Sequence, residues 1–283
     1  MENTRQTESE QWTNWNGRSG CAWVDAQPVV DEMFRPLEKR LTEAVSARSA
    51  KQVLDVGCGT GGTTLAVARL VGEGGHAVGI DISEPMLALA RTRAEQEGLP
   101  ASFLHADAQS HAFEPASFDM IISRFGVMFF DDPVRAFANL RRAARDGAEL
   151  SFIAWRSGAE NPFMTTAERA AAPLLPNIPP RQPDAPGQFA FADRSRVNRI
   201  LEDSGWTGID IRPIDVVCIL PETELVRYFT RFGPLARVLP EADEATRARI
   251  IATVRPAFEP YVHGAEVRYT AACWLVRARS ASA

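Results

Sequence analysis

Short runs of apolar residues recur along the chain, separated by longer segments of mixed polarity. Val53, Leu54 and Val56 form the first clear run, and residues 118–122 form one of the later ones. Runs with few polar interruptions are typical of strands that are buried on both faces of a parallel sheet. We therefore expect seven strands, at residues 53–56, 77–80, 102–104, 118–122, 149–155, 207–219 and 267–277.

The segments between these runs carry the periodicity of amphipathic helices. In the segment 29–46, for example, Val30, Met33, Leu37 and Leu41 fall on one helical face. Ser83 is the predicted N-cap of a helix that ends at Gly98. Strands that alternate with helices in this way predict an α/β fold with a mostly parallel sheet. The other predicted helices are 63–70, 85–97, 133–144 and 193–205, with further helical periodicity over 222–259.

Four glycines follow the first predicted strand within six residues: Gly57, Gly59, Gly61 and Gly62. Glycine allows a sharp turn and a close approach of the backbone to a ligand. The helix that follows would point its N-terminus at that ligand. Gly57, Gly59 and Gly62 also satisfy the spacing of a dinucleotide-binding turn, so the glycines alone leave the ligand open.

Two carboxylates distinguish a dinucleotide from other ligands that the glycine turn could bind. Asp55 comes just before the first glycine, where it would repel a pyrophosphate and attract an ammonium group. Asp81 ends the second strand, where a carboxylate can accept both ribose hydroxyls. Together they predict a nucleoside with a cationic tail. S-adenosylmethionine (SAM) fits, because its methionine tail carries an ammonium group and no phosphate.

Three segments resemble the motifs of the class I SAM-dependent methyltransferases: residues 53–61, 79–83 and 106–108. The chain is similar to the small-molecule branch that includes the ubiquinone- and menaquinone-type enzymes. The similarity is good over residues 50–155 and general elsewhere. It implies a Rossmann-like, seven-stranded sheet of order 3-2-1-4-5-7-6 with strand seven antiparallel, helices on both faces and a helical cap.

The resemblance also implies a set of cofactor contacts. In that family the acidic residue at the position of Asp107 reaches the adenine amino group, although a turn residue is the other interpretation of Asp107. Met86 either touches adenine or belongs to the core. The predicted cofactor-binding residues are Asp55, Gly57, Cys58, Gly59, Thr60, Gly61, Asp81, Ile82, Met86, Ala106, Asp107, Ala108, Ser123, Trp15, Trp23 and Gln27.

The N-terminal segment contains three tryptophans, Trp12, Trp15 and Trp23, around a predicted turn at residues 16–17. Large aromatic side chains need a surface against which to be buried. That surface is either the sheet edge or the bound cofactor, and the sequence leaves both open. In the second case the segment would act as a lid, and Gln27 would reach the carboxylate of SAM as a neutral donor.

We expect a single domain over residues 1–283. Its parts would be an N-terminal lid and helix (1–47), a SAM-binding core (50–155) and two cap insertions (156–192 and 220–262). Prolines crowd the first insertion, which is typical of either an irregular linker or a pocket rim. They are Pro173, Pro176, Pro179, Pro180, Pro183 and Pro186.

Methyl transfer from a sulfonium depends mainly on alignment, so no catalytic side chain is obligatory. A hydroxyl or carbon nucleophile would need a general base. The weak candidates for a catalytic role are His111, Arg124 and His263, and His105 and His76 complete the histidines. Each histidine is more simply a surface or loop residue. Arg124 either anchors an acidic substrate or forms a structural ion pair.

Residues 123–126 read Ser-Arg-Phe-Gly, where methyltransferases acting on adenine or glutamine carry Asn/Asp-Pro-Pro-aromatic. A partial match, Asn-Pro-Phe, begins at Asn161, but it follows the fifth strand instead. This difference disfavours that kind of methylation, and the apolar stretch 125–130 suggests a small, partly apolar substrate. The net charge of −5 does not favour nucleic acid. We expect no metal, because the four cysteines are scattered without a C-x-x-C pair.

The start of the chain lacks the apolar core of a signal peptide, and no apolar run reaches the length of a membrane span. We therefore expect a cytoplasmic protein without a membrane partner, and leave a homodimer open. The leading hypothesis is methyl transfer from SAM to an O, N or C atom of a small molecule, in metabolism or natural-product biosynthesis. The alternatives are a SAM-binding protein without turnover, acting as a sensor or assembly partner, and a protein or RNA methyltransferase.

Overall fold

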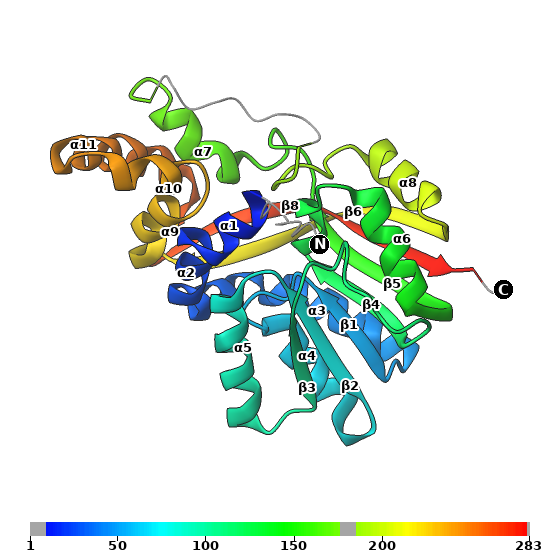
Figure 1. Cartoon of the computed structure of the whole chain (residues 1–283). Coiled ribbons are helices and arrows are strands. Elements are labelled where there is room, and N and C mark those ends of the chain that lie inside the picture. Colours follow the sequence, from blue (N-terminus) through cyan, green and yellow to red (C-terminus); the bar gives the residue numbers. More distant parts are fainter. Residues whose placement is uncertain (1–9, 176–184, 282–283) are drawn as a thin grey trace, which may run out of the picture.

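The computed structural model describes residues 10–175 and 185–281. The predicted lid residues 1–9 and the prolines Pro176, Pro179, Pro180 and Pro183 lie outside the described residues. A single sheet runs through the molecule (Figure 1). Its strands are β1 (Gln52–Val56), β2 (His76–Asp81), β3 (Ala101–His105), β4 (Phe118–Arg124), β5 (Ala144–Trp155), β6 (Trp206–Pro221), β7 (Val262–His263) and β8 (Glu266–Ser280).

The predicted strand order is confirmed. The sheet follows the order β3-β2-β1-β4-β5-β8-β6, and the two-residue β7 pairs only with β8. Without β7 this is the predicted order 3-2-1-4-5-7-6. The neighbours from β3 to β5 are parallel, and β8 runs antiparallel to both β5 and β6. The parallel arrangement brings the carboxyl ends of β1, β2 and β4 to one edge, where open α/β sheets bind their ligands.

Helices cover both faces of this sheet (Figure 1). Leu37 and Leu41 of α3 are fully buried on one side, as the apolar periodicity predicts, and α3 also packs against α4 and β6. The helices are α1 (Glu10–Asn16), α2 (Arg18–Asp25), α3 (Gln27–Arg48), α4 (Gly62–Val71), α5 (Glu84–Glu97), α6 (Pro133–Ala143), α7 (Pro162–Ala171), α8 (Arg194–Asp203), α9 (Leu225–Arg231), α10 (Leu235–Val238) and α11 (Glu244–Val254).

Ser83 is the N-cap residue of α5, as predicted, but its side chain makes no capping hydrogen bond. Its hydroxyl donates to the carbonyl of Trp15 at 2.7 Å. The side chain of Asn16 accepts the hydrogen bond from the Glu84 N–H instead, at 3.0 Å. A residue 68 positions earlier therefore caps this helix.

The segment 222–259 is helical as predicted and forms α9, α10 and α11. Figure 1 shows these helices and α7 gathered on one side of the molecule, beside α1 and α2. Phe163 of α7 stacks on Tyr269 of β8, with 4.0 Å between the ring centroids. Phe163, Phe229 and Phe258 belong to the same hydrophobic core as the strands. The cap helices are therefore packed onto the sheet through shared aromatic side chains.

Asn161, which begins the partial Asn-Pro-Phe match, has a structural position. Its side chain is fully buried, and its amide donates to the carbonyl of Ala272 and accepts from the Ala272 N–H, both at 2.9 Å. This pair of bonds ties the start of α7 to β8. The amide of Asn161 is thus occupied within the fold.

Candidate cofactor and active site

The glycine turn connects β1 to α4 at the carboxyl edge of the sheet. Gly57 has a φ of +67°, and a Cβ atom placed there would lie 2.5 Å from the Cα of Gly126. The backbone at Gly57 thus lies close against the turn after β4. Gly59 has a φ of +55°, and the nearest atom to a Cβ there is the sulfur of Met86 at 3.6 Å. A Cβ at Gly59 would thus make an ordinary van der Waals contact, and it is the positive φ that favours glycine at this position.

Asp81 connects this turn to the next helix. Its carboxylate accepts hydrogen bonds from the Gly59 N–H at 2.8 Å and from the Ser83 N–H at 2.9 Å. Burial raises the pKa of Asp81, and the two N–H donors act in the opposite direction. Met86 is 4% exposed, and Ile82 lies between Asp81 and the start of α5. The structure thus brings Gly59, Asp81 and Met86 together at the carboxyl edge of the sheet.

Asp55 lies beneath the glycine turn and is 2% exposed. Its carboxylate accepts a hydrogen bond from the Thr64 hydroxyl at 2.7 Å. Burial raises the pKa of Asp55 to about 7, against the opposing effects of Thr64 and Arg124. A cationic group brought close to Asp55 would stabilise the ionised form, so this carboxylate is suited to an ammonium partner.

The loop after β3 lies beside the same edge. The Ala106 N–H donates to the carbonyl of Asp81 at 3.1 Å. The carboxylate of Asp107 accepts a hydrogen bond from the Gln109 N–H at 2.8 Å, which agrees with the interpretation of Asp107 as a turn residue. The side chain of Asn139 donates to the carbonyl of Ala108 at 2.9 Å. Sequence reasoning missed Asn139, which holds the loop from α6.

Ser123 is fully buried at the end of β4. Its hydroxyl donates to the Val56 carbonyl at 2.7 Å and accepts from the Gly126 N–H at 3.2 Å. These bonds close the β4 turn onto β1. The Ser123 side chain is therefore occupied by the protein, and the residue has no accessible surface for a cofactor in this structure.

A second missed pair supports the glycine turn from the helix side. Arg93 of α5 donates to the Thr60 carbonyl and to the Asp31 carboxylate, both at 2.7 Å. Burial raises the pKa of the neighbouring Cys58 thiol well above its ordinary value. Next to Cys58 and Thr60, Gly61 has a φ of +84° and completes the turn. Both partners of the Arg93–Asp31 pair are four-fifths buried.

The N-terminal tryptophans contact rings from two other parts of the chain. Trp15 meets Phe129, which follows β4, edge-on with 5.2 Å between centroids. Trp23 meets Phe232 of the cap edge-on at 5.5 Å, and the two tryptophans lie 6.3 Å apart. Gln27 donates to the Asp31 carboxylate at 2.5 Å. Its amide is therefore engaged at the start of α3.

Hydrogen bonds and ion pairs connect α1 and α2 to the loop after Asp81 on one side and to the cap on the other. Asn16 bonds the carbonyl of Ile82 at 2.7 Å as well as capping α5, so it fixes the loop after Asp81. On the other side, Arg18 pairs with Glu241 at 3.0 Å and Asp25 pairs with Arg231. The helices α1 and α2 thus join the Asp81 loop to the cap.

The candidates for proton transfer lie apart. His111 is half-buried in the loop after β3, and His263 is exposed in β7. His105 is exposed at the end of β3, and His76 begins β2 at the opposite end of the strand from Asp81. The structure does not gather these histidines. Of the candidates for a catalytic role, only Arg124 is the last residue of a strand next to the glycine turn.

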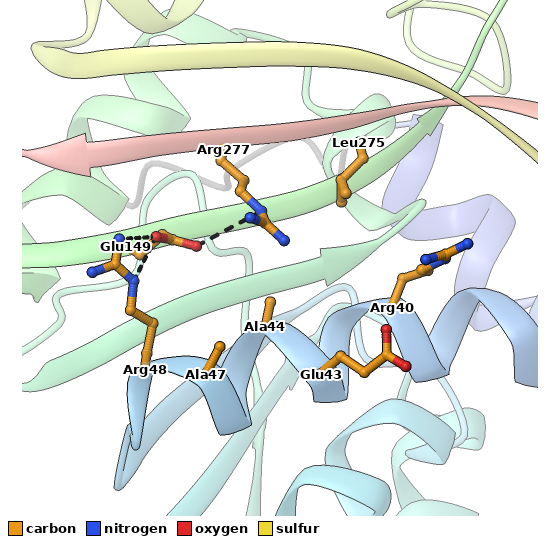
Figure 2. A pocket seen from close by; sticks show the side chains of 8 residues that line it. All are labelled: Arg40, Glu43, Ala44, Ala47, Arg48, Glu149, Leu275 and Arg277. Atoms are coloured by element: carbon orange, nitrogen blue, oxygen red, sulfur yellow. Dashed lines mark hydrogen bonds and ion pairs between the residues drawn. The ribbon is translucent and has the colours of Figure 1, made fainter.

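A cavity of about 210 Å³ lies elsewhere, between the second half of α3 and the strands β5 and β8. Figure 2 shows Arg48 bonded to Glu149, with Arg277 reaching the same carboxylate from β8. The residues that line it include none of the predicted site residues.

In the part of the chain that the structure describes, no helix is long and apolar enough to cross a membrane. The same residues contain no group of three or more metal-ligating side chains.

Residues 53–147 match the family model described as a methyltransferase domain. Residues 53–147 therefore form a methyltransferase domain, and the sheet has the strand order expected of the class I SAM-dependent fold. Relatives include the nocamycin O-methyltransferase of Saccharothrix syringae, 37% identical over 42% of this chain and 43% of that protein. The aklanonic acid methyltransferase DauC of a Streptomyces species is 34% identical over 43% of this chain and 56% of that protein.

An uncharacterized protein of Mycobacterium tuberculosis is 30% identical over 68% of this chain and 66% of its own length. The matched regions thus span between 43% and 66% of these relatives. Among solved structures, YcgJ of Bacillus subtilis superimposes with a TM-score of 0.57 at 16% identity, over 87% of this chain and 98% of that one. The [4+2]-cyclase SpnF superimposes with a TM-score of 0.53 at 21% identity, over 86% and 81%. These likenesses support the fold.

Proposed function

We propose that the chain is an enzyme that transfers a methyl group from SAM to an O, N or C atom of a small molecule. The observation that carries this proposal is the bridge of α1 and α2 across the carboxyl edge of the sheet. Trp15 and Trp23 line that bridge between Phe129 and Phe232. Aromatic rings gathered at this edge suit a small, partly apolar acceptor better than a macromolecule. The names of the nocamycin and aklanonic acid relatives agree with such an acceptor.

The residues at the edge have separate roles in this proposal. Bound SAM supplies the electrophilic methyl group. Asp81 accepts the ribose hydroxyls, Asp107 receives the adenine amino group, and Asp55 faces the ammonium of the tail. The helices α1 and α2 exclude water and hold the acceptor in line, and alignment of this kind can supply about 7–11 kcal/mol of the barrier.

We further propose one domain with the lid, core and cap described above. The shared hydrophobic core of strands and cap helices supports this organisation. A cytoplasmic location with a small-molecule partner and no nucleic acid agrees with the acidic charge and the four free cysteines, three of them buried. The second candidate, SAM binding without methyl transfer, is favoured by one finding: the SpnF structure of the same fold is described as a cyclase.

The test is the formation of S-adenosylhomocysteine (SAH) from SAM by the purified protein. The dialysable and macromolecular fractions of a cell extract are supplied separately as acceptors. The proposal predicts SAH formation with the dialysable fraction. Product formed only with the macromolecular fraction would favour a protein or RNA substrate. SAM binding with no turnover in either fraction would favour the second candidate.

A further inference from the structure

Arg124 has an unusual environment for a charged residue beside a binding site. It is the last residue of β4 and is largely buried. Its Nη1 atom is inaccessible to solvent and has no hydrogen-bond partner among the residues that the structure describes. A buried donor without a partner loses its hydration and gains nothing in return. The other guanidiniums near the glycine turn differ, since Arg93, for example, is fully engaged by Asp31 and Thr60.

The position of Arg124 follows from the register of the sheet. Asp55 pairs with Ile122 across β1 and β4, and Arg124 lies two residues beyond Ile122. Residues two apart on a strand face the same side, so Arg124 and Asp55 point to the same face. On that face the guanidinium carbon of Arg124 lies 5.5 Å from the ring centroid of Phe34 of α3. An apolar ring cannot replace an anionic partner for this group.

Arg124 acts electrostatically on two carboxylates, Asp55 and Glu38, and forms an ion pair with no carboxylate among the described residues. Burial raises the pKa of Asp55 to about 7, and burial also raises the pKa of Glu38, which Arg124 opposes in both cases. An anion brought to the unpaired Nη1 atom would gain a charge-assisted hydrogen bond from Arg124.

We propose that the free nitrogen of Arg124 binds the α-carboxylate of the methionine tail of SAM and SAH. This inference rests on the proposed cofactor and deepens it. The methionine tail is a zwitterion, and Asp55 and Arg124 offer one charge of each sign on the same face beneath the glycine turn. The donor expected from sequence, Gln27, is engaged by Asp31 instead. A guanidinium also matches the two oxygens of a carboxylate better than an amide does.

Isothermal titration calorimetry with SAH and 5′-methylthioadenosine tests the proposal. The second ligand has the nucleoside and sulfur of SAH and lacks the amino-acid group. The variant Arg124→Gln should weaken SAH binding about 10- to 100-fold, the range for loss of a hydrogen bond to a charged group. Its affinity for 5′-methylthioadenosine should equal that of the wild type, which also shows that the variant is folded. Arg124→Lys keeps the charge without the fork and should give an intermediate loss for SAH.

The control is Arg145→Gln, which removes a guanidinium paired with Asp119 near the opposite end of β4. It should leave the affinity for both ligands unchanged. Equal weakening of both ligands by Arg124→Gln would overturn the proposal and make Arg124 a structural residue. Unchanged SAH binding would also overturn it. The anion that pairs with Arg124 would then have to come from an acidic methyl acceptor. Wild-type protein that binds neither ligand would contradict the proposed cofactor itself.

Discussion

Replacing Asp55 by asparagine tests the account of the buried carboxylate beneath the glycine turn. The substitution keeps the size of the side chain and an oxygen that can accept the Thr64 hydroxyl bond. It removes the ionisable group. Asp55 is 2% exposed, so solvent screens its charge very little.

The magnitude follows from the raised pKa. The pKa of Asp55 rises from 3.8 to about 7 in the folded protein, because burial disfavours the charged form. Between these values the unfolded chain loses the proton while the folded protein keeps it. The wild type therefore loses stability as pH rises through this window, by about 1.4 kcal/mol per pH unit and about 4 kcal/mol in all. The asparagine variant has no such loss, because its side chain does not titrate.

Urea unfolding followed by tryptophan fluorescence measures this effect at several pH values from 5 to 8. The difference between the variant and the wild type isolates Asp55, because the other titrating groups are common to both. We expect this difference to move steadily in favour of Asp55→Asn as pH rises and to level off above pH 7. A difference that stays constant across the range would refute the reasoning and place the folded pKa of Asp55 near its ordinary value.

Three further predictions concern the turn and the N-terminal bridge. Asn16→Ala should weaken SAH binding by about 1–3 kcal/mol, because it leaves the Ile82 carbonyl and the Glu84 N–H without their partner. Asn14→Ala, whose hydrogen bond to Ser19 stays within the same segment, is the control and should have no effect in the same calorimetric titration. Gly57→Ala should destabilise the fold by about 1–3 kcal/mol more than Gly264→Ala in chemical denaturation. The two glycines share a φ near +66°, and only Gly57 has a backbone neighbour that a Cβ would meet. Equal losses would argue against that clash. Deleting residues 1–26 should weaken SAH binding and leave the circular dichroism spectrum of the fold intact. Normal binding by the truncated protein would reduce α1 and α2 to packing or a partner surface.

The local sequence pattern predicted the strands of the sheet but not the contacts that support the site. Apolar runs predicted the strands and the glycines predicted the turn after β1, because buried parallel strands and tight turns have local signatures. The strand order followed from the resemblance to the class I methyltransferases. The sequence placed the N-cap at Ser83 correctly, but an asparagine from a distant helix, Asn16, accepts the hydrogen bond from the Glu84 N–H. No local rule identifies such a competitor.

The glycine at position 57 shows a similar limit. The sequence correctly required a residue without a side chain there, but the reason is the approach of Gly126 from the β4 turn. The Arg93–Asp31 pair also joins residues 62 positions apart. Such contacts depend on how helices pack over the sheet, so they become visible only once the fold is assembled.

The central claim is that Asp55, Gly59 and Asp81 form a site for SAM. Isothermal titration calorimetry of the purified protein with SAM, SAH, NAD and NADP tests it most directly. The account predicts binding of SAM and SAH, no binding of either dinucleotide, and a loss of about 1–3 kcal/mol for SAH in Asp81→Ala. NAD or NADP bound more tightly than SAH, or no binding of SAM at all, would contradict it.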